Sequence, residues 1–108
     1  MQKTNLTPDP GASLQHRFAK KSICFGCGPS NKDGLQIASH ESTDGQSVYA
    51  WFKPQSFHQA FPNVLNGGII GAVLDCHSNW TAAWALMKQS GQDTPPCTVT
   101  SEFSIKLL

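Results

Sequence analysis

One carboxylate stands out because it lies within a long apolar segment that begins with two glycines. Asp75 is the only acidic residue between Gly67 and Gln89, and it follows the Gly67-Gly68 pair by about two helical turns. A helix leaves its first backbone N–H groups without partners, and glycines let a substrate come close to them. The helix dipole adds positive potential there. This combination of an anion-stabilising helix start and an acid indicates chemistry on a carbonyl group.

Three further residues ahead of the helix are candidates for the same site. Asn66 directly precedes the glycine pair, where it can cap the helix or donate from its side-chain amide, but it cannot carry a proton in acid–base chemistry. His58 and Phe61 lie in a predicted loop, residues 55–65, that could line a substrate pocket. A purely structural role for His58 is equally open. His77 is about 200° around a helix from Asp75, so we expect it to be packed rather than catalytic.

The element that must position Asp75 is a helix over residues 67–89. Apolar side chains cover most of its circumference, which is wider than the stripe of a surface helix. Ser90-Gly91 supplies a C-terminal stop. Such a helix must be covered on most sides, and we read it as buried rather than membrane-spanning, because Asp75, His77, Ser78 and Asn79 interrupt its middle.

The rest of the chain predicts an antiparallel sheet. Residues 35–39, 47–53 and 97–108 read as strands, and Asp44-Gly45 is a strong hairpin signal between the first two. Residues 1–21 read as a leader with a possible short helix at 14–22. We therefore expect the domain to occupy residues 22–108.

The sizes of these elements do not match. A helix of about 22 residues is about 33 Å long, whereas three strands about 4.8 Å apart form a ribbon only about 14 Å wide. The last predicted strand runs to Leu108 without a turn. We therefore expect the sheet to be completed by strands of a longer domain or by a partner chain.

Composition excludes several classes of function. The 108 residues carry a net charge of +1 and no basic run, which argues against nucleic acid as a partner. The first residues lead into no apolar signal region, so a cytoplasmic location with free thiols is the expectation. Cys24 and Cys27 have the spacing of half a zinc site, with His58 and Cys97 as spare ligands. No second pair follows, so we expect a structural loop and no metal.

Several short motifs together resemble one enzyme family. They are Cys-Phe-Gly-Cys-Gly at 24–28 with Asn31 and Gly34-Leu35, His-Gln-Ala-Phe-Pro at 58–62, Asn-Gly-Gly at 66–68 with Asp75, Pro-Cys-Thr-Val-Thr at 96–100, and Ile-Lys-Leu-Leu at 105–108. Over residues 22–108 the chain resembles the hotdog-fold thioesterases of the phenylacetate-degradation (PaaI-like) type. The glycine pair with its acid is the specific part of the resemblance.

The resemblance implies an α+β hotdog fold, in which an antiparallel sheet wraps a long central helix. It also implies a homodimer or a dimer of dimers, an acyl-coenzyme A substrate and no bound cofactor. Asp75 would attack the thioester or deprotonate a water, facing Gly67 and Gly68 of the other subunit, while His58 and Phe61 would bind substrate. The family often has His where this chain has Asn66, which leaves the role of position 66 open.

Two other functions remain alternatives. A hydratase or dehydratase of the same fold also places a helix acid near a loop histidine, but its acid follows the histidine more closely and a Pro-Gly pair opens its helix. A non-catalytic module would bind acyl thioesters without turnover, and Asp75 would be dispensable for binding.

Overall fold

A computed structural model describes residues 13–108, and its central element is helix α2, Gly67–Ser90. Asn66 caps the start of α2, and Gly91 ends it in the left-handed conformation with φ of 71°. Both ends are set by local chemistry, since Asn is a favoured N-cap and Gly adopts positive φ without strain. The helix predicted over residues 67–89 is thus confirmed.

A first hairpin packs near the middle and end of α2. Strands β1, Ser39–Glu41, and β2, Val48–Ala50, pair antiparallel with Ser39 opposite Ala50. Their connection contains the predicted Asp44-Gly45 turn, in which Gly45 has φ of 71°. The hairpin is confirmed, but both strands are only three residues long. The first begins at Ser39, where the predicted strand over residues 35–39 ends.

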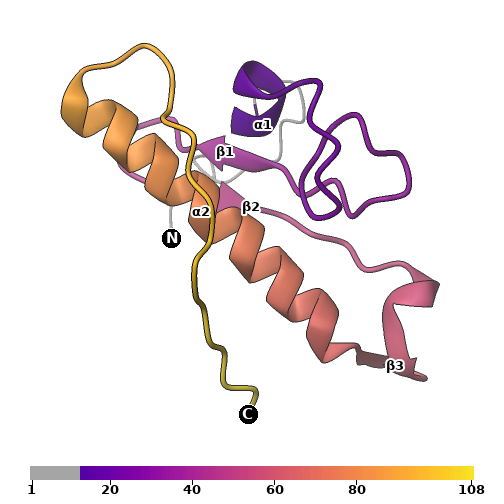
Figure 1. Cartoon of the computed structure of the whole chain (residues 1–108). Coiled ribbons are helices and arrows are strands. Elements are labelled where there is room, and N and C mark those ends of the chain that lie inside the picture. The colour runs from indigo at the N-terminus through magenta and orange to yellow at the C-terminus, as the bar shows by residue number, and fades with distance from the viewer. Residues whose placement is uncertain (1–12) are drawn as a thin grey trace.

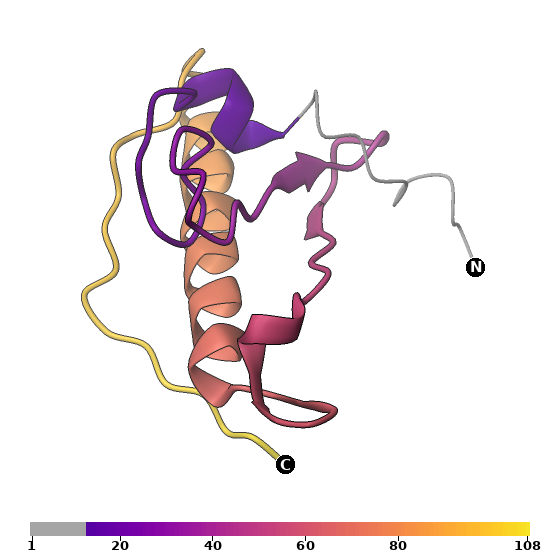
Figure 2. The ribbon, with the colours of Figure 1, turned by 90° about the vertical axis from the view of Figure 1, so that its right-hand side faces the viewer.

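A second hairpin, absent from the predictions, leads into α2. The short 3-10 helix η3, Ser56–His58, is followed by strands β3, Gln59–Phe61, and β4, Val64–Leu65, which pair antiparallel. Figure 2 shows this hairpin beside the N-terminal end of α2. The expectation of an irregular loop over residues 55–65 was therefore wrong. No glycine marked its turn; Asn63 adopts positive φ there instead, at 67°.

The possible helix at 14–22 is confirmed only in its first part, as α1, Leu14–Phe18. Ser13 caps it, and the side chains of Leu14 and Gln15 are almost fully buried. Gln15 holds the backbone and side chain of Ser39, donating to its Oγ at 3.0 Å and accepting from its N–H at 2.8 Å. This contact fixes α1 against β1 (Figure 1). Residues 1–12 of the predicted leader lie outside the described residues.

Residues 97–108 form no strand, so that prediction was wrong. The segment runs along α2 on the side away from β1 and β2 (Figures 1 and 2). Its apolar side chains approach the glycines of α2: Phe103 and Ile105 lie beside Gly71, and Leu107 lies beside Gly67. Alternating apolar residues predict a strand only if a partner strand is available, and both hairpins lie on other sides of the helix.

The described chain is thus a small α+β fold, with one long helix and two two-stranded antiparallel sheets. One chain does not wrap α2 fully, since Leu74 and Leu86 each remain 46% exposed. Within the described residues, no helix combines the length and apolarity that crossing a membrane requires.

Candidate functional site

The start of α2 is organised by the side chain of Asn66. Its Oδ1 accepts hydrogen bonds from the backbone N–H of Gly68 at 2.8 Å and of Ile69 at 3.3 Å. With the oxygen bound to the helix, the amide nitrogen Nδ2 points away from it. Within the described residues, neither Nδ2 of Asn66 nor the N–H of Gly67 has a hydrogen-bond acceptor. Two donors are therefore available together at this helix end.

Asp75 lies half-buried in the wall of an open cavity. Its Oδ1 accepts a 2.6 Å hydrogen bond from Thr100 Oγ1. The cavity has a volume of about 450 Å³ and lies between α2 and residues 99–105, with Ser78 and Asn79 on the helix side. A small molecule entering this cavity would meet the carboxylate directly.

His58 ends η3, just ahead of the second hairpin, whereas Phe61 lies on strand β3 of that hairpin. The His58 side chain is buried, and its Nδ1 accepts a hydrogen bond from Gln55 N–H at 2.9 Å, which closes η3. Its ring stacks on Phe52 and meets Phe57 edge-on. Phe61 is 63% exposed on β3. His58 therefore has an evident packing role, while Phe61 is free to contact another molecule.

One chain does not bring these residues together. Gly67 and Asp75 are eight positions apart on one helix, which corresponds to about 12 Å along its axis. The cavity beside Asp75 is lined by none of the other predicted site residues, Asn66, Gly67, Gly68, His58 and Phe61. A carbonyl group bound at the helix start thus lies out of reach of Asp75 of the same chain.

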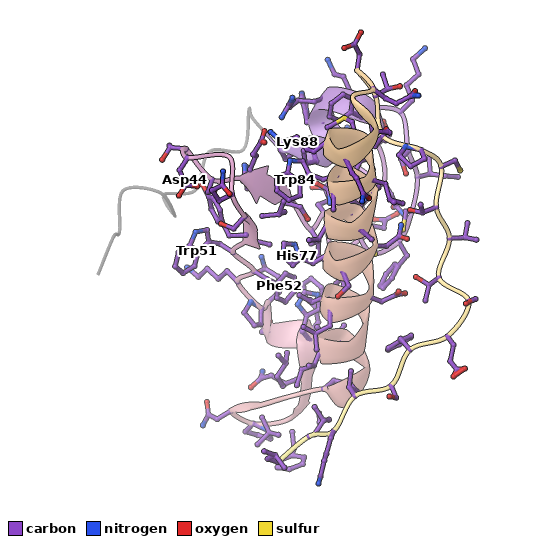
Figure 3. All side chains as sticks on the ribbon, turned by 90° about the vertical axis from the view of Figure 1, so that its left-hand side faces the viewer. Asp44, Trp51, Phe52, His77, Trp84 and Lys88 are labelled. Atoms are coloured by element: carbon purple, nitrogen blue, oxygen red, sulfur yellow. The ribbon has the colours of Figure 1, made fainter. Side chains whose placement is uncertain are left out.

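His77 lies on a different face of α2 from Asp75, as its angular offset predicts. Its Nδ1 forms a 2.9 Å hydrogen bond with Ser39 Oγ, so that it joins α2 to β1 (Figure 3). Burial lowers the pKa of His77, against an opposing hydrogen bond with the backbone of Val48. A neutral histidine in this position packs the sheet onto the helix.

A second candidate group of side chains was only partly predicted from the sequence, which paired Cys24 with Cys27 but left out Cys76. Cys76 brings its Sγ to Cys24 and Cys27, and the three sulfur atoms all lie within 4.8 Å of one another. The hydrogen bond from Cys76 lowers the pKa of Cys27 to about 6, although burial opposes this. That same hydrogen bond, together with burial, raises the pKa of Cys76. The cluster therefore holds one readily formed thiolate.

The predicted spare ligands do not join this cluster. His58 ends the 3-10 helix η3, and Cys97 lies outside the group of three, although it lines the cavity beside Cys24 and Cys27. Cys76 was overlooked because it sits alone in an apolar helix, 52 residues after Cys24.

Comparison of the chain with family models, with curated proteins and with solved structures gave no match. The resemblance to hotdog-fold thioesterases therefore rests on the short sequence motifs alone.

Proposed function

We propose that the chain is an acyl-thioester hydrolase with a hotdog fold, acting as a pair of copies on acyl-coenzyme A or a similar carrier. One observation carries this proposal: the Asp75 carboxylate is held by Thr100 in the wall of an open cavity, on the helix whose first turn presents free donors. The Asp75 carboxylate can act as a base, and the donors at the start of α2 can stabilise an oxyanion. Thioester hydrolysis requires both functions.

The donors for the developing oxyanion are the N–H of Gly67 and the Nδ2 of Asn66. The N–H of Gly68 already donates to Asn66 Oδ1. Of the two glycines expected to donate to the oxyanion, only Gly67 therefore has an N–H that is free within the described part of the chain. Donors aimed at a developing oxyanion are worth a few kcal/mol each. Asn66 thereby gains two roles, capping α2 through its oxygen and polarising the thioester through its nitrogen.

Asp75 acts as a general base in this proposal. Thr100 holds Oδ1, which leaves Oδ2 to take a proton from water. The water oxygen bonds to the thioester carbon, and the tetrahedral intermediate then collapses with cleavage of the carbon–sulfur bond. The proton on Asp75 passes to the departing thiolate, so the products are a carboxylic acid and a thiol.

A second copy of the chain completes the site. Since about 12 Å separates Gly67 from Asp75 within one helix, the carbonyl group must be bound by one copy and attacked by water activated on the other. The exposed Leu74 and Leu86 on α2 supply apolar surface for such pairing. The active unit is then a homodimer, which can assemble further into a dimer of dimers.

The first test is thiol release from a panel of acyl-coenzyme A substrates. Asp75→Asn should lower kcat by about 10²- to 10⁴-fold, the usual contribution of a general base. The matched control is Asp93→Asn, which alters an exposed acid after the end of α2 and should leave kcat unchanged. Near-normal turnover by the Asp75 variant would refute the proposal. Hydration of enoyl-coenzyme A would instead support the hydratase alternative. Binding of acyl thioesters that does not depend on Asp75 and leads to no turnover would support the non-catalytic binding module.

A mixing experiment tests the pairing of copies. Gly67→Pro removes the N–H donor at a helix position where proline is well tolerated, and its ring also displaces the end of the Leu107 side chain and narrows the approach for substrate. Asn66 already has φ of −62° and ψ of 132°, which suits a residue before proline. Each of the Gly67→Pro and Asp75→Asn variants should be inactive alone. Their mixed dimer contains one intact site and should regain activity, whereas no recovery in demonstrated mixed dimers would contradict a shared site.

A further inference from the structure

The three clustered cysteines lie outside the site of the proposed hydrolysis and come from two separate elements. Cys24 and Cys27 belong to a tight loop, whereas Cys76 projects from the middle of α2. None of the three is in a disulfide. Thiol groups from distant parts of a chain that converge in this way are typical of a site for a thiophilic metal ion.

The distances fit tetrahedral coordination. Zinc–sulfur bonds of about 2.3 Å in a tetrahedron place the sulfur atoms about 3.8 Å apart. Cys24 Sγ and Cys76 Sγ are 3.9 Å apart, and all three separations are within 4.8 Å. Small side-chain rotations therefore suffice to place all three sulfur atoms around one ion.

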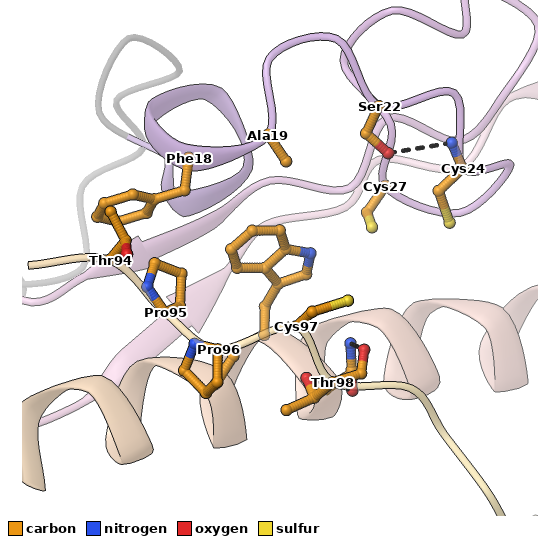
Figure 4. A pocket seen from close by; sticks show the side chains of 13 residues that line it. Phe18, Ala19, Ser22, Cys24, Cys27, Thr94, Pro95, Pro96, Cys97 and Thr98 are labelled. Carbon is orange, nitrogen blue, oxygen red and sulfur yellow. Dashed lines mark hydrogen bonds between the residues drawn. The ribbon is translucent and has the colours of Figure 1, made fainter. Parts of the chain in front are cut away.

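The loop is shaped to bring its thiols onto the helix. A Cβ at Gly26 would collide with the sulfur of Cys76, so glycine at this position permits the close approach. The N–H of Gly28 donates to the Cys24 carbonyl at 2.8 Å, and the N–H of Cys24 donates to Ser22 Oγ at 3.2 Å (Figure 4). The loop is also tied to the following chain by a 3.0 Å bond from Ile37 N–H to the Gly26 carbonyl. Its geometry is therefore fixed on both sides of the thiols.

Space for a further ligand lies beside the cluster. Cys24 and Cys27 line a cavity of about 440 Å³ formed by α1, α2 and residues 94–98 (Figure 4). Trp80 and Pro96 give this cavity apolar walls. Metal sites with three protein ligands leave the fourth position to water or a small molecule, which this cavity can admit.

We propose that Cys24, Cys27 and Cys76 bind one Zn²⁺ ion per chain as thiolates, with the fourth coordination position facing the cavity. The sequence spacing alone offers only two of these ligands, and the fold supplies the third. Three thiolates favour Zn²⁺ over harder cations such as Mg²⁺ and Ca²⁺. This site is independent of the proposed hydrolysis, because it uses neither Asp75 nor the start of α2.

The test is a titration of the reduced, chelator-treated full-length chain with Zn²⁺ in competition with a chromophoric chelator. One ion should bind per chain, and Co²⁺ in its place should give thiolate-to-metal charge transfer in the near ultraviolet. Cys76→Ser should weaken Zn²⁺ binding by about 100-fold or more. Loss of a residue that only hydrogen-bonds to a metal ligand already lowers metal affinity by about 10- to 100-fold, and Cys76 is a ligand itself. The control is Glu102→Gln, which alters an exposed side chain outside both the cluster and its cavity and should leave affinity within about threefold.

A second variant keeps all of the cysteines, so it tests whether the arrangement of the thiols matters and not only their number. Gly26→Ala displaces the Cys76 sulfur and should also weaken Zn²⁺ binding, with the fold checked by circular dichroism. The proposal is overturned if Cys76→Ser binds Zn²⁺ as tightly as the unmodified chain, or if Glu102→Gln loses as much affinity. Absence of charge transfer from bound Co²⁺ in the unmodified chain would overturn it without recourse to any variant.

Discussion

Thr100 Oγ1 donates a 2.6 Å hydrogen bond to Asp75 Oδ1, which fixes the carboxylate from a segment without secondary structure. A neighbouring pair strengthens the attachment, since Asn79 Nδ2 donates to the Thr98 carbonyl and Thr98 Oγ1 donates to Asn79 Oδ1. The direction of the carboxylate thus depends on two side-chain contacts along one face of α2.

Thr100→Val should separate the orientation of Asp75 from its presence. The variant keeps the shape of the side chain but loses the donor, so kcat should fall by about 10- to 100-fold through misplacement of the base. Because the bond is exposed, the free energy of unfolding should change by less than about 1 kcal/mol. Thiol-release kinetics and thermal unfolding measure the two effects. Thr100→Ser retains the hydroxyl and should restore most of the rate; an unchanged kcat in Thr100→Val would show that this bond does not orient the base.

Two substitutions at Asn66 should separate its two roles. Asn66→Ala removes the cap and should lower the free energy of unfolding by about 1 kcal/mol. Asn66→Asp keeps a capping oxygen, which the helix dipole favours, but has no amide donor for the substrate. We expect both variants to lose turnover and only the alanine variant to lose stability, measured by denaturant unfolding beside thiol release. Full activity in Asn66→Asp would exclude the amide from the oxyanion site.

Glu41 should make stability depend on pH in the acid range. Burial raises the pKa of Glu41. Hydrogen bonds from Trp84 Nε1 at 3.0 Å and from Lys88 Nζ at 3.1 Å lower it by more, so the pKa lies below its ordinary value of 4.5 (Figure 3). When the pKa of a carboxyl group is lower in the folded state than in the unfolded state, the ionised group stabilises the fold. This stabilisation is complete above the pKa of the unfolded state and is lost as the pH falls through the pKa of the folded state.

Glu41→Gln should therefore cost about 0.5–1 kcal/mol of unfolding free energy at pH 7, as befits a solvent-accessible charged network. The difference from the unmodified chain should shrink as the pH falls below 4.5. Urea unfolding across this range measures it. The control is Glu102→Gln, the same change at an exposed position, which should show no such trend. A constant difference across the range would argue against a role for the ionised carboxylate.

Gly91 offers a prediction that depends on backbone conformation alone. A Cβ there would meet nothing within 4 Å, but φ is 71°. Gly91→Ala should therefore destabilise the chain by about 1 kcal/mol through strain at the end of α2. Thermal unfolding should show a loss of about 4–8 °C for a domain of this size. Gly91→Asn should lose less, because Asn tolerates this conformation, and equal losses would point to another cause.

The features that the sequence predicts well are those with local causes. Asn66 and Gly91 mark the two ends of α2 through capping chemistry, and Asp44-Gly45 marks a turn through its backbone preference. The position of His77 away from Asp75 follows from helical geometry alone. None of these requires knowledge of distant contacts.

The errors concern features that depend on contacts between distant segments. The alternation of Phe103, Ile105 and Leu107 predicts a strand, yet these side chains pack on the glycine face of α2. The thiol of Cys76 joins those of a loop far earlier in the chain, and no spacing rule links them.

The cysteine cluster has a consequence in terms of chain entropy. The contact of Ser39 with His77 joins positions 38 residues apart, so that Cys24 and Cys76 are then separated only by the short segment that precedes Ser39 and by one step along α2. Loop-closure entropy grows only logarithmically, by about 0.6 kcal/mol for each doubling of length. Once β1 has docked on α2, convergence of the thiols therefore requires little further ordering. An incoming ion would meet a largely preorganised site, and most of its binding energy would remain available as affinity.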